Sequence, residues 1–81
     1  STKAVSAAVM LNLLGEKGYE GEALYEGFDE ALRMEGVKVH LYGKKITKPF
    51  RKMGHVTIVD VNVESAMEKA RELKRILKVK A

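Results

Sequence analysis

A helical repeat of apolar residues near the C-terminus is the feature that most limits how this chain can fold. Apolar side chains recur every three to four residues along one stripe, as an amphipathic helix requires; they are Val63, Ala66, Met67, Ala70, Leu73 and Leu77. Asn62 is a natural N-cap before this stripe, and Glu64 lies in the expected first turn. Lys74, Arg75 and Lys78 crowd the last turn, where positive charge suits the helix dipole. The sequence therefore predicts a helix over residues 63–78.

Two segments before this helix have the pattern of strands. Residues 37–42 alternate, with three apolar side chains on one face and Lys38, His40 and Tyr42 on the other. Residues 51–60 contain the string GHVTIV, which is rich in β-branched residues. The loop over residues 43–50 joins the two segments directly, and this connection favours an antiparallel pair.

The first third of the chain is less decisive. Residues 4–14 are mostly apolar and fit either a buried strand or a short buried helix. Three glycines predict a loop over residues 15–21, and a second helix is expected after it, ending before Gly36. Its apolar stripe consists of Leu24, Phe28, Ala31 and Leu32, and Gly27 weakens it. Together these elements predict an α+β fold with a small antiparallel sheet and two helices.

The length and composition exclude several classes of protein. A chain of 81 residues can enclose one core, so residues 1–81 are expected to form a single domain. The absence of cysteine excludes a disulfide scaffold, a cysteine-ligated zinc site and a thiol nucleophile, and it makes the cytoplasm the expected compartment. No apolar run approaches the roughly 18 residues of a membrane helix, so no membrane partner is expected. Abundant lysine and glutamate with no glutamine favour a thermophilic source.

The positive charge is concentrated in one stretch. No acid occurs between Glu35 and Asp60, whereas six cations do. The rest of the chain holds nine of the fifteen lysines and arginines against all eleven acids, so the net charge of +4 arises within this stretch. An anionic ligand is one interpretation, and a solvated basic loop is the plainer alternative. The six cations are Lys38, Lys44, Lys45, Lys48, Arg51 and Lys52.

Three of these cations are the candidate anion ligands. Lys44, Arg51 and Lys52 flank the loop where it joins the strands, so their positions are better fixed than those of cations near its middle. An ammonium group and a planar guanidinium together suit a phosphate monoester. Tyr42 is a fourth candidate, because its hydroxyl could meet the same ligand; the alternative is that its ring covers apolar surface.

Catalytic, metal-binding and cofactor-binding residues are not predicted within this chain. His40 and His55 are the only imidazoles, and they lack the third ligand of fixed spacing that a metal site needs. No nucleophile or orienting carboxylate stands beside either of them. The sequence has neither GxxxxGK[ST] nor GxGxxG, so the chain is not expected to bind ATP by itself. A nucleic-acid-binding module remains an alternative, in which Tyr42 and Phe50 would stack on bases among the lysines.

Three strings in the sequence resemble one known family. They are AAVMLNLLG at residues 7–15, VHLYGK at residues 39–44 and KPFRKMGHVTIV at residues 48–59. In this order and spacing they are similar to the strings AVMVNLLG, HLYGK and RPGRKMGHVT of 5-carboxyaminoimidazole ribonucleotide synthetase, the ATPase subunit of phosphoribosylaminoimidazole carboxylase. That family belongs to the ATP-grasp superfamily. The match lies in its C-terminal domain, a rudiment single hybrid motif.

The resemblance implies a role in purine biosynthesis. It implies a ligase that uses ATP and bicarbonate to carboxylate aminoimidazole ribonucleotide, with ATP and Mg²⁺ bound by upstream ATP-grasp domains. This chain would be the C-terminal portion, inactive alone, with those domains and the ribonucleotide as partners and a homodimer as a possible assembly. Lys44, Arg51 and Lys52 match positions expected to meet the substrate's phosphate. The sibling families, formate-dependent glycinamide ribonucleotide transformylase and biotin carboxylase, are the alternatives.

Two residues depart from the family's usual pattern. Lys48 stands where the family has arginine, and Phe50 stands where it has glycine. Glycine adopts positive φ without steric cost and phenylalanine does not, so the path of the loop between Lys44 and Arg51 is left open by the sequence.

Overall fold

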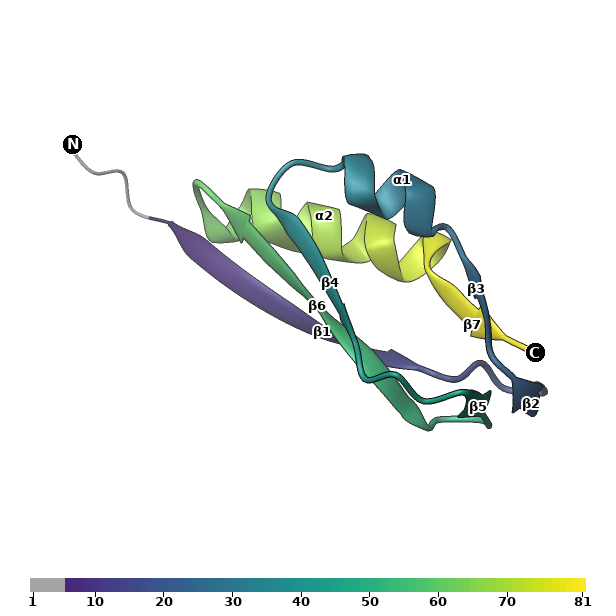
Figure 1. The fold of residues 1–81 in the computed structure, drawn as a ribbon. Helices are drawn as coiled ribbons and strands as arrows, with labels where there is room; N and C mark the ends of the chain where they lie inside the picture. The colour runs from purple at the N-terminus through teal and green to yellow at the C-terminus, as the bar shows by residue number, and fades with distance from the viewer. Residues whose placement is uncertain (1–5) are drawn as a thin grey trace.

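The computed structural model describes residues 6–81, which fold into antiparallel sheets and two helices (Figure 1). This confirms the predicted α+β class. Strand β6 lies at the centre of a three-stranded sheet of order β1-β6-β4, and two short ribbons pair β2 with β5 and β3 with β7. The elements are β1 (Ala7–Leu14), β2 (Gly21–Glu22), β3 (Leu24–Glu26), α1 (Phe28–Arg33), β4 (Val37–Leu41), β5 (Ile46–Thr47), β6 (Lys52–Asp60), α2 (Val63–Ile76) and β7 (Lys78–Lys80).

The apolar N-terminal segment, which the sequence left open, is a strand. Its burial alternates along β1, which pairs antiparallel with β6 so that Ala7 faces Asp60 and Asn12 faces His55. Residues 4 and 5 of that segment lie outside the described residues. The predicted pairing of the next two strands is confirmed, since β4 runs antiparallel to β6 and His40 lies opposite His55.

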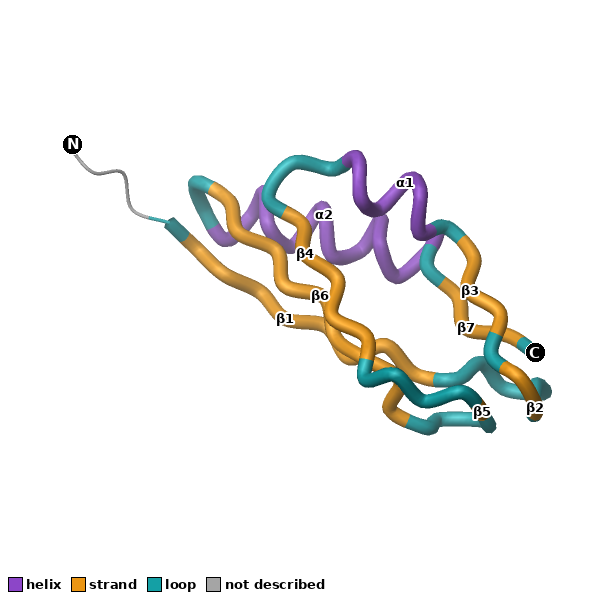
Figure 2. Tube along the Cα trace, in the orientation of Figure 1, coloured by secondary structure: helices purple, strands orange, loops and turns teal. Residues whose placement is uncertain are grey.

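Both helices cover the same face of the three-stranded sheet (Figures 1 and 2). Inward side chains of β6 pack against α1 and α2 in one core, because strand side chains alternate between faces. Its fully buried members include Met53, Val56, Ile58, Ala31, Ala66 and Leu73. In the part of the chain that the structure describes, no helix covers the opposite face of this sheet, which is called the open face below.

The helix predicted after residue 21 begins later than expected. Leu24 lies in β3, which pairs with β7, and its side chain is 60% exposed. The helix begins only at Phe28, because Gly27 has a φ of 82° and breaks the helical path. Gly27 is also packed against the end of α2, where a Cβ atom would collide with the carbonyl oxygen of Ile76. The predicted stripe was therefore interrupted by a close approach between two elements distant in sequence.

The last helix is confirmed, with a shorter C-terminal end. Its N-cap is Asn62 as predicted, since the Asn62 side chain accepts a hydrogen bond of 2.7 Å from the amide of Ser65. Lys78 lies in β7 and not in the last turn of the helix. Val63 and Met67, which belonged to the predicted apolar stripe, are exposed, and the buried side of the helix is formed by Ala66, Ala70 and Leu73.

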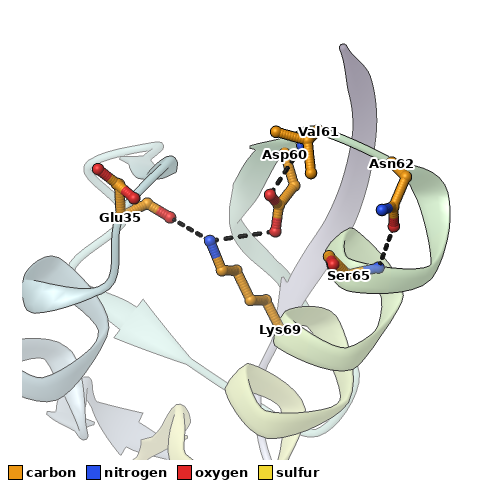
Figure 3. Close-up of polar contacts among 6 residues, drawn as sticks. All are labelled: Glu35, Asp60, Val61, Asn62, Ser65 and Lys69. Atoms are coloured by element: carbon orange, nitrogen blue, oxygen red, sulfur yellow. Dashed lines mark hydrogen bonds and ion pairs between the residues drawn. The ribbon is translucent and has the colours of Figure 1, made fainter. Parts of the chain in front are cut away.

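A polar network fixes the start of α2 against the sheet (Figure 3). The Lys69 ammonium donates to the carbonyl oxygen of Glu35 at 2.8 Å and lies 3.2 Å from a carboxylate oxygen of Asp60. The other Asp60 oxygen accepts a 2.7 Å hydrogen bond from the amide of Val61. The hydrogen bond from Val61, followed by that from Lys69, lowers the pKa of Asp60 below its ordinary value of 3.8. The network joins α2 to the end of β6 and to the chain leaving α1.

Candidate functional site

The basic loop, residues 43–50, joins the end of β4 to the start of β6. The side chain of Lys44 reaches across the two ends of this loop, which are called its mouth below. The ladder continues one step beyond β4, since the amide of Tyr42 donates to the carbonyl oxygen of Met53 at 3.0 Å. Gly43 then turns the chain with a φ of 78°. The Lys44 ammonium donates a 2.7 Å hydrogen bond to the carbonyl oxygen of Lys52. This contact holds the half-buried Lys44 side chain beside the start of β6.

A tight turn ends the loop. The amide of Arg51 donates to the carbonyl oxygen of Lys48 at 3.1 Å. Pro49 occupies the second position of this turn and Phe50 the third, with a φ of 65°. Proline followed by a residue of positive φ is the pattern of a type II turn. Phe50 therefore adopts the conformation for which glycine is suited, and its side chain remains 68% exposed.

Gly15 seats this turn on the end of β1. The Gly15 carbonyl accepts from the amide of Phe50, and the Gly15 amide donates to the carbonyl of Arg51, both at 2.9 Å. A Cβ atom at Gly15 would collide with the carbonyl oxygen of Lys48 and the hydroxyl of Thr47. Sequence reasoning treated Gly15 only as the start of a loop, because a contact with residues more than thirty positions away leaves no local pattern.

Tyr42 joins the basic loop to the open face of the sheet. The Tyr42 hydroxyl lies 3.1 Å from Nδ1 of His55, and the Lys44 ammonium lies 5.8 Å from the centre of the Tyr42 ring. The sequence left open whether Tyr42 offers its hydroxyl or covers apolar surface. The structure gives the hydroxyl an imidazole partner, while 43% of the residue remains exposed.

A row of polar side chains crosses the open face beside Tyr42. His40 and His55 lie opposite each other, and their rings stack at 4.9 Å between centroids with 11° between planes. Asn12 faces His55 from the other side, on β1. The approach of His40 to His55 follows from the predicted pairing of their strands. The place of Asn12 in the row was missed, because it needs β1 in register with β6 and the sequence left β1 undecided between strand and helix.

The structure brings together some of the predicted ligands of the anion. Lys44 and Tyr42 lie side by side, and Lys44 contacts the main chain of Lys52. For Arg51 only main-chain hydrogen bonds are found within residues 6–81, while its side chain is half-buried. The loop's middle is tied down by β5, which pairs with β2, and Lys45 and Lys48 are exposed.

The cations of the acid-free stretch are not paired with carboxylates in the described residues. The ion pairs found within residues 6–81 are formed by four other cations, which all lie outside the acid-free stretch: Lys69, Arg75, Lys78 and Lys80. Within residues 6–81, no three histidine, aspartate or glutamate side chains are grouped closely enough to hold a metal ion. Neither helix of the described chain is long and apolar enough to cross a membrane.

Comparison with known proteins places the chain in a family. Residues 8–69 match the model of the phosphoribosylaminoimidazole carboxylase C-terminal domain. The chain belongs to this family. Its fold matches the crystal structure of N5-carboxyaminoimidazole ribonucleotide synthetase from Thermotoga maritima with a TM-score of 0.87 and 58% identity, over 91% of this chain and 21% of that one. The resemblance inferred from the three sequence strings is thereby confirmed, as is the fold that it implied.

Two curated relatives extend the comparison. The chain is 40% identical over 78 residues to N5-carboxyaminoimidazole ribonucleotide synthase of Aquifex aeolicus, covering 96% of this chain and 20% of that protein. It is 38% identical over 55 residues to formate-dependent phosphoribosylglycinamide formyltransferase of Syntrophotalea carbinolica, covering 68% of this chain and 14% of that protein. The chain thus spans a fifth or less of the length of these curated relatives.

Proposed function

We propose that this chain is the substrate-side C-terminal domain of an ATP-dependent ligase that carboxylates aminoimidazole ribonucleotide in purine biosynthesis. The observation that carries the proposal is the likeness to the Thermotoga maritima synthetase, which combines 58% identity with a TM-score of 0.87 over 91% of the chain.

We assign the ribonucleotide's phosphate to Lys44, Arg51, Lys52 and Tyr42. Three cations at the mouth of one hairpin, without carboxylate partners in the described chain, provide an electropositive site. The relatives support a phosphate ligand, because their names contain aminoimidazole ribonucleotide in one case and phosphoribosylglycinamide in the other. These two compounds share the phosphoribosyl group, and a cationic site in a shared domain suits the part they share.

ATP, Mg²⁺ and bicarbonate are assigned to the remainder of the enzyme. The chain covers 20% of the Aquifex aeolicus protein, and residues 6–81 offer no cluster of three metal-ligating side chains. The sequence also lacks a phosphate-binding glycine-rich loop of either common pattern. The domain alone is therefore expected to be inactive.

The test is made in the full-length enzyme that carries this domain. Lys44→Met keeps most of the side chain's length but removes the charge, and Lys38→Met is the matched control within the same acid-free stretch. Losing one charged contact to phosphate should raise the KM for aminoimidazole ribonucleotide about ten- to a hundredfold, with the KM for ATP unchanged. An unaltered KM for the ribonucleotide would contradict the phosphate assignment.

A second candidate is favoured by the Syntrophotalea carbinolica relative, whose name specifies a formate-dependent formyltransferase. The two candidates are separated by substrate choice in the same full-length enzyme. Release of ADP that depends on aminoimidazole ribonucleotide and bicarbonate supports the carboxylating ligase. Release that depends on glycinamide ribonucleotide and formate supports the formyltransferase instead.

A further inference from the structure

We propose that Asn12, His55 and His40 form a contact surface for the heterocycle of the ribonucleotide whose phosphate is bound beside Lys44. This inference rests on the proposed function and extends it from the phosphate to the base. The surface lies on the open face of the sheet, where the register of β1, β6 and β4 places the three side chains in one row.

The direction of the row fits a ligand that begins at the cations. The Lys44 ammonium lies 5.8 Å from the centre of the Tyr42 ring, and the Tyr42 ring lies 5.8 Å from the His55 ring. A ligand whose phosphate meets Lys44 would therefore lay its sugar over Tyr42 and bring its base to His55. Beyond His55 the row continues to Asn12 on β1.

Tyr42 determines which nitrogen of His55 is available to a ligand. The Tyr42 hydroxyl lies 3.1 Å from Nδ1 of His55, and which of the two groups donates depends on the tautomer of the imidazole. The contact occupies Nδ1 and leaves Nε2 of His55 to a ligand. The ring thus offers a polar atom of defined position, and the stacked His40 ring at 4.9 Å limits its rotation.

The chemistry of the row matches a small planar heterocycle and differs from that of the phosphate site. Imidazole and phenol rings present flat surfaces on which another ring can stack. The Asn12 amide adds both donors and an acceptor. Asn12 is the only polar side chain among the eight residues of β1, and asparagine is disfavoured in strands. An exposed asparagine opposite His55 is therefore not explained by the stability of the strand.

The experiment compares two ligands in the full-length enzyme. Aminoimidazole ribonucleotide carries phosphate, ribose and heterocycle, whereas ribose 5-phosphate lacks the heterocycle. Calorimetric titration of each ligand is made with His55→Gln, Asn12→Ala and Lys44→Met. The matched control is Thr57→Val, which changes a hydroxyl on the same face of β6, opposite Met10 and Lys38.

His55→Gln and Asn12→Ala should each weaken binding of aminoimidazole ribonucleotide roughly tenfold, while ribose 5-phosphate binds as it does to the wild type. Unchanged ribose 5-phosphate binding also shows that these variants are folded. Lys44→Met should weaken the binding of both ligands, and Thr57→Val should weaken the binding of neither. Tyr42→Phe should weaken the binding of both ligands, because Tyr42 is assigned to the phosphate, and it should weaken aminoimidazole ribonucleotide more, because it also frees the imidazole of His55.

Two results would overturn the inference while leaving the phosphate site intact. In one, Lys44→Met weakens both ligands but the His55 and Asn12 variants bind aminoimidazole ribonucleotide normally. In the other, the His55 and Asn12 variants lose affinity for ribose 5-phosphate as much as for aminoimidazole ribonucleotide. That result would mean that the row contacts the phosphate or is needed for folding. A Lys44→Met enzyme that binds both ligands normally would instead remove the proposed phosphate site, and the inference with it.

Discussion

The Lys44 ammonium donates a 2.7 Å hydrogen bond to the main-chain carbonyl of Lys52, so two proposed phosphate ligands are linked across the mouth of one hairpin. The link uses the side chain of one residue and only the main chain of the other. Lys44 is held in place by this contact, whereas the side chain of Lys52 is exposed and has no such restraint from residues 6–81.

The two lysines should therefore differ in their effect on substrate binding. In the full-length enzyme, Lys44→Met should raise the KM for aminoimidazole ribonucleotide by at least about tenfold. Lys52→Met should raise it by less than about threefold, because the carbonyl that positions Lys44 remains and an exposed ammonium contributes little. Steady-state kinetics at saturating ATP measures both. Equal effects would mean that the side chain of Lys52 is held by the ligand as firmly as that of Lys44.

Gly15→Ala tests how the loop is seated on β1. The added Cβ would collide with the Lys48 carbonyl, so we expect a loss of about 1–3 kcal/mol in the free energy of unfolding. The displaced turn should also raise the KM for the ribonucleotide. Denaturant unfolding gives the first quantity. Gly18→Ala is the matched control: it has open space around it but a φ of 91°, so it should cost about 1 kcal/mol and leave the KM unchanged.

Phe50 is strained by its φ of 65°, a conformation that asparagine tolerates better. Phe50→Asn should therefore raise the free energy of unfolding by about 0.5–1 kcal/mol. Phe50→Ala keeps the strain and loses the ring, so it should give no gain. Thermal denaturation of the three proteins under one condition distinguishes them. If Phe50→Ala raises the free energy of unfolding and Phe50→Asn does not, the exposed ring, and not the main-chain conformation, would be what destabilises the wild type.

Asp60 should make stability depend on pH in the acid range. Its pKa is lowered in the folded state, so the stabilisation is present above the ordinary value of 3.8 and is lost as the pH falls through the lower folded pKa. Asp60→Asn should unfold at a lower temperature than the wild type at pH 7, and the two should converge at strongly acid pH. Lys69→Met should produce a smaller change, because the larger cause, the hydrogen bond from Val61, remains. Melting curves measured between neutral and acid pH would show no convergence if Asp60 acted only through packing.

The elements with a strong local period could be predicted from the sequence. The stripe that ends at Leu73 and Leu77 and the cap at Asn62 predicted α2, and the alternation around His40 predicted β4. The helix expected to include Leu24 was predicted too long, because the contact of Gly27 with Ile76 depends on tertiary packing. Local patterns do not contain such contacts.

The candidate site could be predicted only in part, because local sequence patterns do not contain contacts between distant residues. Lys44 and Lys52 stand at the ends of a loop whose flanking strands are evident in the sequence, so their meeting could be inferred. Asn12 could not be found this way, since its place beside His55 depends on pairing between strands that lie about forty residues apart. The sequence signal that could have pointed to Asn12 was its place as a single polar residue within an apolar segment.

Because both helices lie on one side of the sheet, mutations on its two faces have different consequences. Mutations on the packed side alter whether the domain forms at all, whereas Asn12, His40 and Thr57 can change with little disturbance to Met53 or Ile58 beneath them. On the proposed function, a domain built in this way is expected to change its ligand preference through a few substitutions on the open face while its folding is preserved.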